Sequence, residues 1–385
     1  MNNIIKYLAF IFLINNIVFS ISGFYDYAES FFLIFMGASL LVVMYSVNIL
    51  KNMIFDKSFQ LFFILNFINL VYYLFIELGD FESLKYLSAR FVQFSIFSIS
   101  IYSLKEDFPS KFTKLLKIIT IGSLFISLLF NFPNFESRYM GIFFNPNEFS
   151  IIMVIGFALI LFTENKTTIN YLILTLFLLV IVLSGSRSAI VGLSLAIITY
   201  VLHYKSRNLN NIIFIVLTMI AFSLLGGQNN AIQRMFNVDL LVNRRYEYLY
   251  AIDTFLQKPI FGHGLKNYAF IDFSLIQFND VQIDFGAHNG YLSILVQYGI
   301  IFSIIFFSVF IYFLNKIYKS KIEAFGENIL QTKFLFFLIS YTLVNGMFEN
   351  TLIGINFFQS NLFWITLAYL LFVLYQKDES NSISD

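Results

Sequence analysis

The chain has 385 residues, of which 58% are hydrophobic and only 12% charged, and its mean hydropathy is +0.77. This composition leaves too little polar surface to cover a water-soluble globule, so it predicts an all-α fold, a polytopic membrane helical bundle. A net charge of +1 argues against nucleic acid as a partner, because tracking phosphates requires a concentrated basic face. The absence of cysteine excludes disulfides, Cys-ligated zinc and thiol catalysis.

Crossing the bilayer core takes about 20 mostly apolar residues per helix, and we expect about twelve such spans. They lie near residues 4–22, 31–50, 59–78, 86–104, 115–132, 148–163, 169–184, 187–204, 211–226, 289–314, 333–353 and 358–375. The triplet Ser20-Ile21-Ser22 after the first run is typical of a signal-peptide cleavage site, but we favour an uncleaved first span.

These spans divide the chain into four parts. Residues 1–226 hold spans one to nine, 227–288 form one large extracytoplasmic loop, 289–375 hold spans ten to twelve, and 376–385 form a tail. With the N-terminus in the cytoplasm, most of the 24 lysines and arginines fall on inner segments. The positive-inside rule therefore places both termini in the cytoplasm and the large loop outside.

Six of the seven arginines nevertheless lie on or near the outer side, and two of them, Arg138 and Arg187, are close to helix starts. Spans six, eight and ten all run inward, so their N-terminal ends, with unpaired N–H groups and a positive dipole, face outward. If these ends converge, they form an anion site in which arginine binds phosphate oxygens bidentately. The polar segments at the three ends are Arg138 with Asn145-Pro146-Asn147-Glu148, Ser184-Gly185-Ser186-Arg187, and His288-Asn289.

Each of these residues also has a simpler interpretation. Arg187 could be an interfacial anchor and Arg138 a loop charge, while Asn145-Pro146-Asn147 is by itself an ordinary helix-start signal. Glu349 is predicted to lie in span eleven on the same face as Asn345, either as a functional group or as a wetted structural one.

The large loop contains a predicted helix over residues 244–257, which Pro259 ends. Leu249, Ile252 and Leu256 share one face at helical spacing, so we expect the helix to lie on the membrane or on the bundle. A tight turn follows around His263, which stands between two glycines and is more often a turn residue than a catalyst.

The chain resembles the O-antigen ligase and O-antigen polymerase superfamily, the WaaL- and Wzy-type membrane glycosyltransferases. Four elements in the region 138–299 carry the resemblance: Arg138-x-x-Gly141 before Asn145-Pro146-Asn147; Ser186-Arg187; Arg244 or Arg245 before Pro259-x-x-Gly262-x-Gly264; and His288-Asn289 with Leu292 and Gly299. His263 inside the Gly-x-Gly turn and Phe302 after the last glycine depart from the family pattern.

The resemblance implies a glycan donor on undecaprenyl pyrophosphate at the outer face of a bacterial cytoplasmic membrane. Arg187 and either Arg244 or Arg245 would neutralise the pyrophosphate, and His288 would orient or deprotonate the acceptor hydroxyl for an inverting attack. No cofactor or metal is implied, because the arginines supply the charge of a divalent ion. The residues expected to bind substrate are Arg138, Asn145, Asn147, Ser186, Asn289 and Glu349.

The expected partners are the lipid-linked donor and acceptor and membrane lipid, with a chain-length regulator and a flippase as further candidates. We favour a polymerase over a ligase that transfers to lipid A core or protein, because the outer loop is moderate in size. A transporter of lipid-linked sugars and a peptidoglycan-type polymerase with a carboxylate in its outer loop are the rival functions.

Overall fold

The computed structural model describes residues 5–45, 51, 53, 56–133, 137–164, 166–201, 239–272, 274, 287–320, 322–325 and 328–384. These residues form helices, turns and one isolated bridge between Ile21 and Phe143, and they contain no strand. The predicted all-α, polytopic membrane fold is therefore confirmed.

Eleven of the twelve predicted spans coincide with a helix, and the ninth, 211–226, lies outside the described residues. The helices are α2 (Leu8–Phe19), α3 (Tyr25–Tyr45), α5 (Gln60–Ile76), α6 (Phe81–Leu104), α7 (Phe108–Phe130), α8 (Pro146–Leu161), α9 (Thr168–Ser184), α10 (Arg187–Val201), α14 (Gly290–Lys319), α15 (Ile329–Asn345) and α16 (Phe358–Ser384).

The two largest differences from the predicted bounds are at the ends of α15 and α16. α15 stops at Asn345 rather than near 353, and α16 continues through most of the predicted tail. By length and composition, five helical stretches are long and apolar enough to cross a membrane: Tyr25–Tyr45, Lys57–Ile76, Phe81–Phe130, Gly290–Lys319 and Phe358–Lys377. Five shorter apolar helices of 10–17 residues lie among them. The four-part division of the chain stays a prediction.

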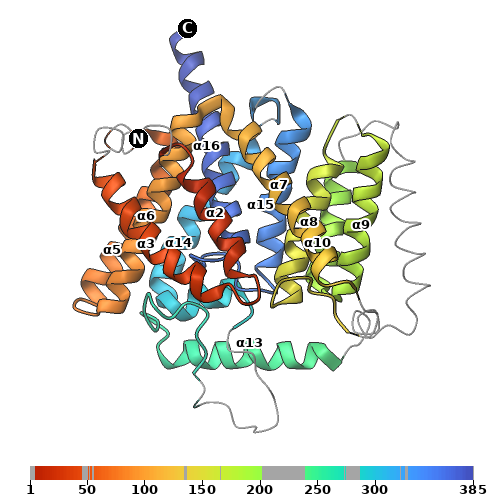
Figure 1. Cartoon of the computed structure of the whole chain (residues 1–385). Helices are drawn as coiled ribbons and strands as arrows, with labels where there is room; N and C mark the ends of the chain where they lie inside the picture. Colours follow the sequence, from red (N-terminus) through yellow and green to blue (C-terminus); the bar gives the residue numbers. More distant parts are fainter. Residues whose placement is uncertain are drawn as a thin grey trace.

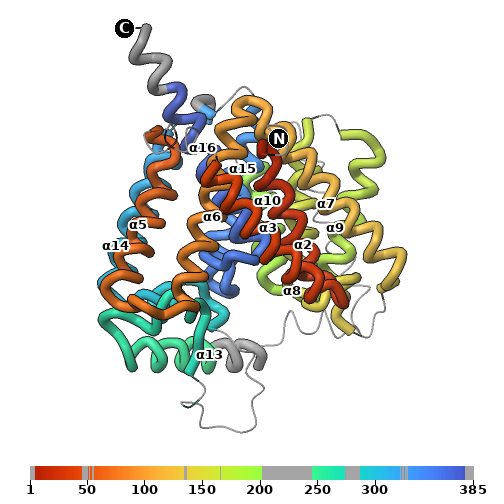
Figure 2. The backbone as a smooth tube through the Cα atoms, turned by 60° about the vertical axis from the view of Figure 1, so that its left-hand side comes forward, coloured from red at the N-terminus to blue at the C-terminus, as the bar shows by residue number. Residues whose placement is uncertain are grey.

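The helices pack side by side in one bundle, and the ends of the chain lie on the same side of it (Figure 1). α13 (Asp239–Gln257) lies across the opposite end of the bundle (Figures 1 and 2). α16 is the central helix, since 94% of its apolar window is buried, against 28% for α3 at the periphery. The bundle thus has one end that carries α13 and the helix starts of α8, α10 and α14.

The irregular link between α15 and α16, residues 346–357, runs into the bundle, where its backbone needs partners. The buried guanidinium of Arg90 donates to the carbonyl of Ile353, and Trp364 Nε1 donates to that of Leu352 at 2.9 Å. Gln93 Nε2 donates to the carbonyl of Ile355 at 3.4 Å. These polar side chains hold the link in one conformation and so position the residues it carries.

Candidate functional site

α8 begins at a polar cluster. The side chain of Asn145 caps the helix by accepting from the backbone N–H of Asn147 at 2.8 Å, and Pro146 suits the first turn because it has no N–H to satisfy. Arg138 donates from Nε to the carbonyl of Ser184 at 2.8 Å and from Nη2 to Asn147 Oδ1 at 2.6 Å. Arg138 therefore joins the end of α9 to the start of α8.

α14 begins at the other half of the site. Asn289 Oδ1 caps the helix by accepting from the backbone N–H groups of Tyr291 and Leu292, both at 3.0 Å. Its Nδ2 donates to the carbonyl of Met347 at 3.2 Å. Both ends of this amide thus contact protein groups, and the contacts fix His288, which has the uncommon positive φ of 39°.

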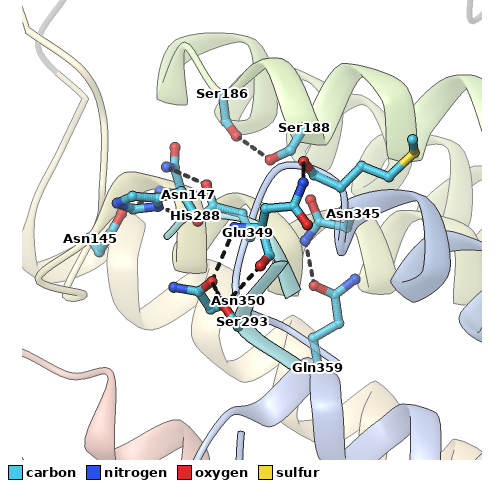
Figure 3. A network of polar contacts seen from close by, with 12 residues as sticks. Asn145, Asn147, Ser186, Ser188, His288, Ser293, Asn345, Glu349, Asn350 and Gln359 are labelled. Atoms are coloured by element: carbon cyan, nitrogen blue, oxygen red, sulfur yellow. Dashed lines mark hydrogen bonds and ion pairs between the residues drawn. The ribbon is translucent and has the colours of Figure 1, made fainter. Parts of the chain in front are cut away.

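A His–Glu pair lies between these two helix starts. His288 Nδ1 is 3.2 Å from Glu349 Oε2, and Asn147 Nδ2 donates to Glu349 Oε1 at 3.0 Å (Figure 3). The two paired side chains are only 19% and 16% exposed. Arg138, Asn147, Glu349 and His288 therefore form one continuous chain of polar contacts across segments far apart in sequence.

Glu349 reaches this position because it is not in a helix. The prediction that it shares a helical face with Asn345 is wrong, since α15 ends at Asn345 and Glu349 lies in the following link. Asn345 is buried and donates from Nδ2 to Gln359 Oε1 at 2.6 Å instead. The apolar run in the sequence continues past the point where the helix stops, so hydropathy alone does not reveal its end.

The pair opens onto a cavity of about 410 Å³, within the range of small-molecule sites. Its acidic lining residues are Glu148 and Glu349, and the lining includes no lysine or arginine among the residues that the structure describes. The polar lining residues are Ser20, Asn145, Asn147, Glu148, His288, Glu349, Asn350, Thr351, Asn356 and Gln359, and the apolar ones are Phe19, Tyr25, Phe144, Ile151, Ile152, Phe357 and Phe358.

Sequence reasoning missed part of this lining. Glu148 was visible only as an acidic residue in the first turn of a helix, and Thr351 and Gln359 belong to no motif. Phe19 at the end of α2 and Tyr25 at the start of α3 also had no signal, because their place in the lining depends on how distant segments come together.

The Ser186-Arg187 element stands apart from this cavity. Arg187 is partly exposed as the first residue of α10, and neither residue lines the cavity. Ser186 is buried, and its Oγ is 3.1 Å from Ser188 Oγ (Figure 3). Arg138 connects this element to the site, because it donates both to the carbonyl of Ser184, two residues before Ser186, and to Asn147.

α13 confirms the predicted loop helix and lies over this end of the bundle. Tyr248 Oη donates at 2.7 Å to the carbonyl of Met347, the same carbonyl that binds Asn289. Leu249, Ile252 and Leu256 are 44%, 40% and 59% exposed, so the predicted apolar face points away from the bundle. Of the two candidate arginines, Arg245 is exposed, and the side chain of Arg244 lies outside the described part of the chain.

The turn after α13 docks onto a kink in α14. At Gly299 (φ 65°, ψ −177°) the helical conformation breaks, which frees carbonyls one turn earlier. His263 N donates to Val296 O at 2.8 Å, Gly264 N to Gln297 O at 3.0 Å, and Ile300 N to Pro259 O at 2.8 Å. A Cβ on Gly299 would lie 2.5 Å from Gly262 N, so the two glycines allow this close approach.

His263 and Lys266 secure the same turn. His263 Nε2 is 2.6 Å from the carbonyl of Thr254, in agreement with a turn role. Lys266 Nζ lies 2.7 Å from Asp80 Oδ2, and this hydrogen bond holds the pKa of Asp80 below its ordinary value. Two motifs that are distant in sequence, Pro259-x-x-Gly262-x-Gly264 and His288-Asn289 with Gly299, are therefore the two sides of one contact.

A bundle of apolar helices with a polar site at one end defines a polytopic membrane protein. Residues 172–307 match the family model described as O-antigen ligase, and this match supports a relation to the O-antigen ligase and polymerase superfamily. The match includes Arg187, Arg244, Arg245 and His288 and does not separate polymerase from ligase. No curated protein matches the chain.

Proposed function

We propose that the protein is an inverting glycosyltransferase that polymerises undecaprenyl-pyrophosphate-linked repeat units at the outer face of the bacterial cytoplasmic membrane. The observation that carries the proposal is the His288–Glu349 pair at the wall of a cavity, at the end of the bundle that also carries α13. The positive-inside pattern supports the outward orientation of this end.

The pair suits general-base catalysis. An ionised carboxylate only accepts hydrogen bonds, so the Nδ1–H of His288 donates to Glu349 and the lone pair of Nε2 is left for the substrate. Nε2 takes the proton of the acceptor hydroxyl, whose oxygen forms the bond to the anomeric carbon of the donor. The bond from that carbon to the pyrophosphate oxygen breaks from the opposite face, and undecaprenyl pyrophosphate leaves. Glu349 stabilises the imidazolium that forms.

Arginines support the departure of the leaving group. Arg187 at the start of α10 and Arg244 or Arg245 on α13 are the candidates that neutralise the pyrophosphate as its negative charge develops. On this proposal transfer is independent of a divalent ion. We expect the purified protein to retain its activity in excess chelator, and loss of activity that Mg²⁺ or Mn²⁺ restores would contradict this part of the mechanism.

The test compares surface polysaccharide on gels from a null strain complemented with wild type or with Arg187→Ala, Arg244→Ala, Arg245→Ala or His288→Ala, at matched membrane expression. Loss of long chains while single repeat units still reach the lipid A core is the result expected for a polymerase. Long chains stranded on the lipid carrier would instead identify a ligase. Wild-type patterns for both His288→Ala and Arg187→Ala would overturn the site.

A further inference from the structure

The cavity beside His288 is lined by acidic side chains, which do not suit the negatively charged pyrophosphate. Both of its acidic lining residues, Glu148 and Glu349, carry carboxyl groups, and no basic side chain of the described residues lines it. An anionic leaving group placed there would be repelled, since like charges at close range disfavour each other in a partly buried site. The pyrophosphate therefore belongs outside this cavity, with the candidate arginines Arg187 and Arg244 or Arg245. The cavity then takes another part of the substrates.

Polar atoms in the lining lack partners. Among the described residues, Glu148 Oε2, Thr351 Oγ1 and Gln359 Nε2 are buried and form no hydrogen bond. Nine other described side-chain atoms are also buried without a partner, but these three belong to residues that line one cavity, where a ligand can supply partners. They comprise an acceptor, a hydroxyl and a donor, which together complement the hydroxyl groups of a sugar.

The apolar lining agrees with the same ligand. Phe144, Phe357 and Tyr25 offer aromatic surface for the C–H faces of a sugar ring. A polyprenyl chain would be served by the same rings, but it would leave the three polar atoms without partners. A ligand that is hydroxyl-rich and uncharged or cationic satisfies both parts of the lining.

We infer that this cavity is the acceptor-sugar site and that Glu148 is a specificity-determining residue that accepts hydrogen bonds from the acceptor's hydroxyl or amino groups. This inference rests on the proposed function, because an acceptor sugar in the cavity has its hydroxyl beside Nε2 of His288 only if His288 is the general base. It also implies that the acceptor's non-reducing terminal sugar is neutral or an amino sugar.

The test measures binding separately from transfer. The probe is the repeat-unit oligosaccharide released by mild acid from the lipid carrier that accumulates in the null strain, and the full chain is used in detergent. Glu148→Gln keeps the size of the side chain, and we expect it to weaken probe binding by about 10- to 100-fold, the range for a hydrogen bond to a charged group. Thr351→Val should weaken it by about 2- to 10-fold.

Matched controls make the same changes elsewhere. Glu29→Gln alters an exposed carboxylate on α3, and Thr120→Val removes a buried hydroxyl whose hydrogen bond stays within α7. Both should bind the probe as wild type does, and thermal unfolding of all four variants excludes misfolding as the cause. Inorganic pyrophosphate and undecaprenyl phosphate should not displace the probe.

Wild-type binding by folded Glu148→Gln, displacement of the probe by pyrophosphate or undecaprenyl phosphate, or an acidic terminal sugar on the acceptor would each overturn the inference. These results are distinguishable from failure of the proposed function. If His288→Ala abolishes polymer while Glu148→Gln binds normally, the function stands and the acceptor site is elsewhere. If the probe binds through Glu148 while no variant alters the polysaccharide, the protein binds sugar at this cavity without the proposed transfer.

Discussion

At the scale of single residues, Glu349 has both carboxylate oxygens engaged, one by Asn147 and the other by His288. Glu349→Gln keeps the size and can still accept from Nδ1, but it removes the charge that stabilises the imidazolium. We expect transfer to slow by about 10²- to 10⁴-fold, the usual contribution of a positioned general base. Initial rates of polymer formation in membranes containing the lipid-linked substrate measure this.

The control for this prediction is Glu82→Gln, which changes an exposed glutamate in the first turn of α6. It breaks a surface salt bridge to Lys85, which contributes little to stability, so its rate should equal that of wild type. A Glu349→Gln variant with a normal rate, beside an inactive His288→Ala, would show that His288 works without the carboxylate.

Asn289 is expected to act through His288 rather than on the substrate directly. Asn289→Ala removes the cap of α14, which costs about 1 kcal/mol of stability and loosens the backbone of His288. Asn328→Ala removes an equivalent side-chain cap from α15, away from the cavity. We expect both variants to lower the melting temperature in detergent and only Asn289→Ala to lower the transfer rate. Equal rates for the two would remove Asn289 from the site.

At the scale of elements, the contact between the turn after α13 and the kink of α14 sets where the loop helix lies. Gly299→Ala would place a Cβ 2.4 Å from Ile260 O in a backbone conformation that side chains rarely adopt. We expect a loss of about 1–3 kcal/mol in the free energy of unfolding, together with loss of transfer as α13 shifts. Chemical unfolding followed by tryptophan fluorescence from Trp364 measures the first effect.

Gly122→Ala is the matched control, because nothing lies within 4 Å of the added Cβ and the position is in the middle of α7. It should leave stability unchanged or raise it slightly, since alanine favours helix more than glycine does. If Gly299→Ala unfolds and polymerises like this control, the docked turn does not position α13.

The two motifs that meet in this contact illustrate what sequence could and could not supply. Gly262 and Gly264 were recognisable as turn glycines and Gly299 as part of a family pattern, but nothing in the spacing showed that Gly262 and Gly299 require each other. In the same way, the amphipathic run predicted α13, whereas the direction of its apolar face depended on how the turn docks.

At the scale of the whole molecule, the bundle has its chain ends on one side and α13 on the other (Figure 1). Because the chain has no cysteine, single-cysteine variants report orientation without background. We expect Lys258→Cys, just after α13, to react with a membrane-impermeant maleimide in intact spheroplasts. Lys319→Cys, at the C-terminal end of α14 and so far from His288, should react only after permeabilisation. The reverse pattern would place the site in the cytoplasm and contradict the proposed use of an outer-leaflet donor.

The sequence by itself determined the membrane class, the helical fold and the approximate position of eleven apolar helices, because these follow from local composition and from the length needed to cross a bilayer. It also indicated the starts of α8, α10 and α14 as polar ends, through caps and charges that act within a single turn. Such features depend only on neighbouring residues, so no knowledge of packing is required.

Only the tertiary structure decided which polar ends share a cavity and which partner His288 has. Glu349 lies in the link between α15 and α16, part of which the hydropathy pattern predicts as helix. Buried polar groups from α6 and α16 hold that link in place. The acidic lining, with Glu148 beside residues from the first hairpin, depends on contacts between segments more than a hundred residues apart. Side-chain contacts over such separations are set by packing, for which a single sequence carries no local signal.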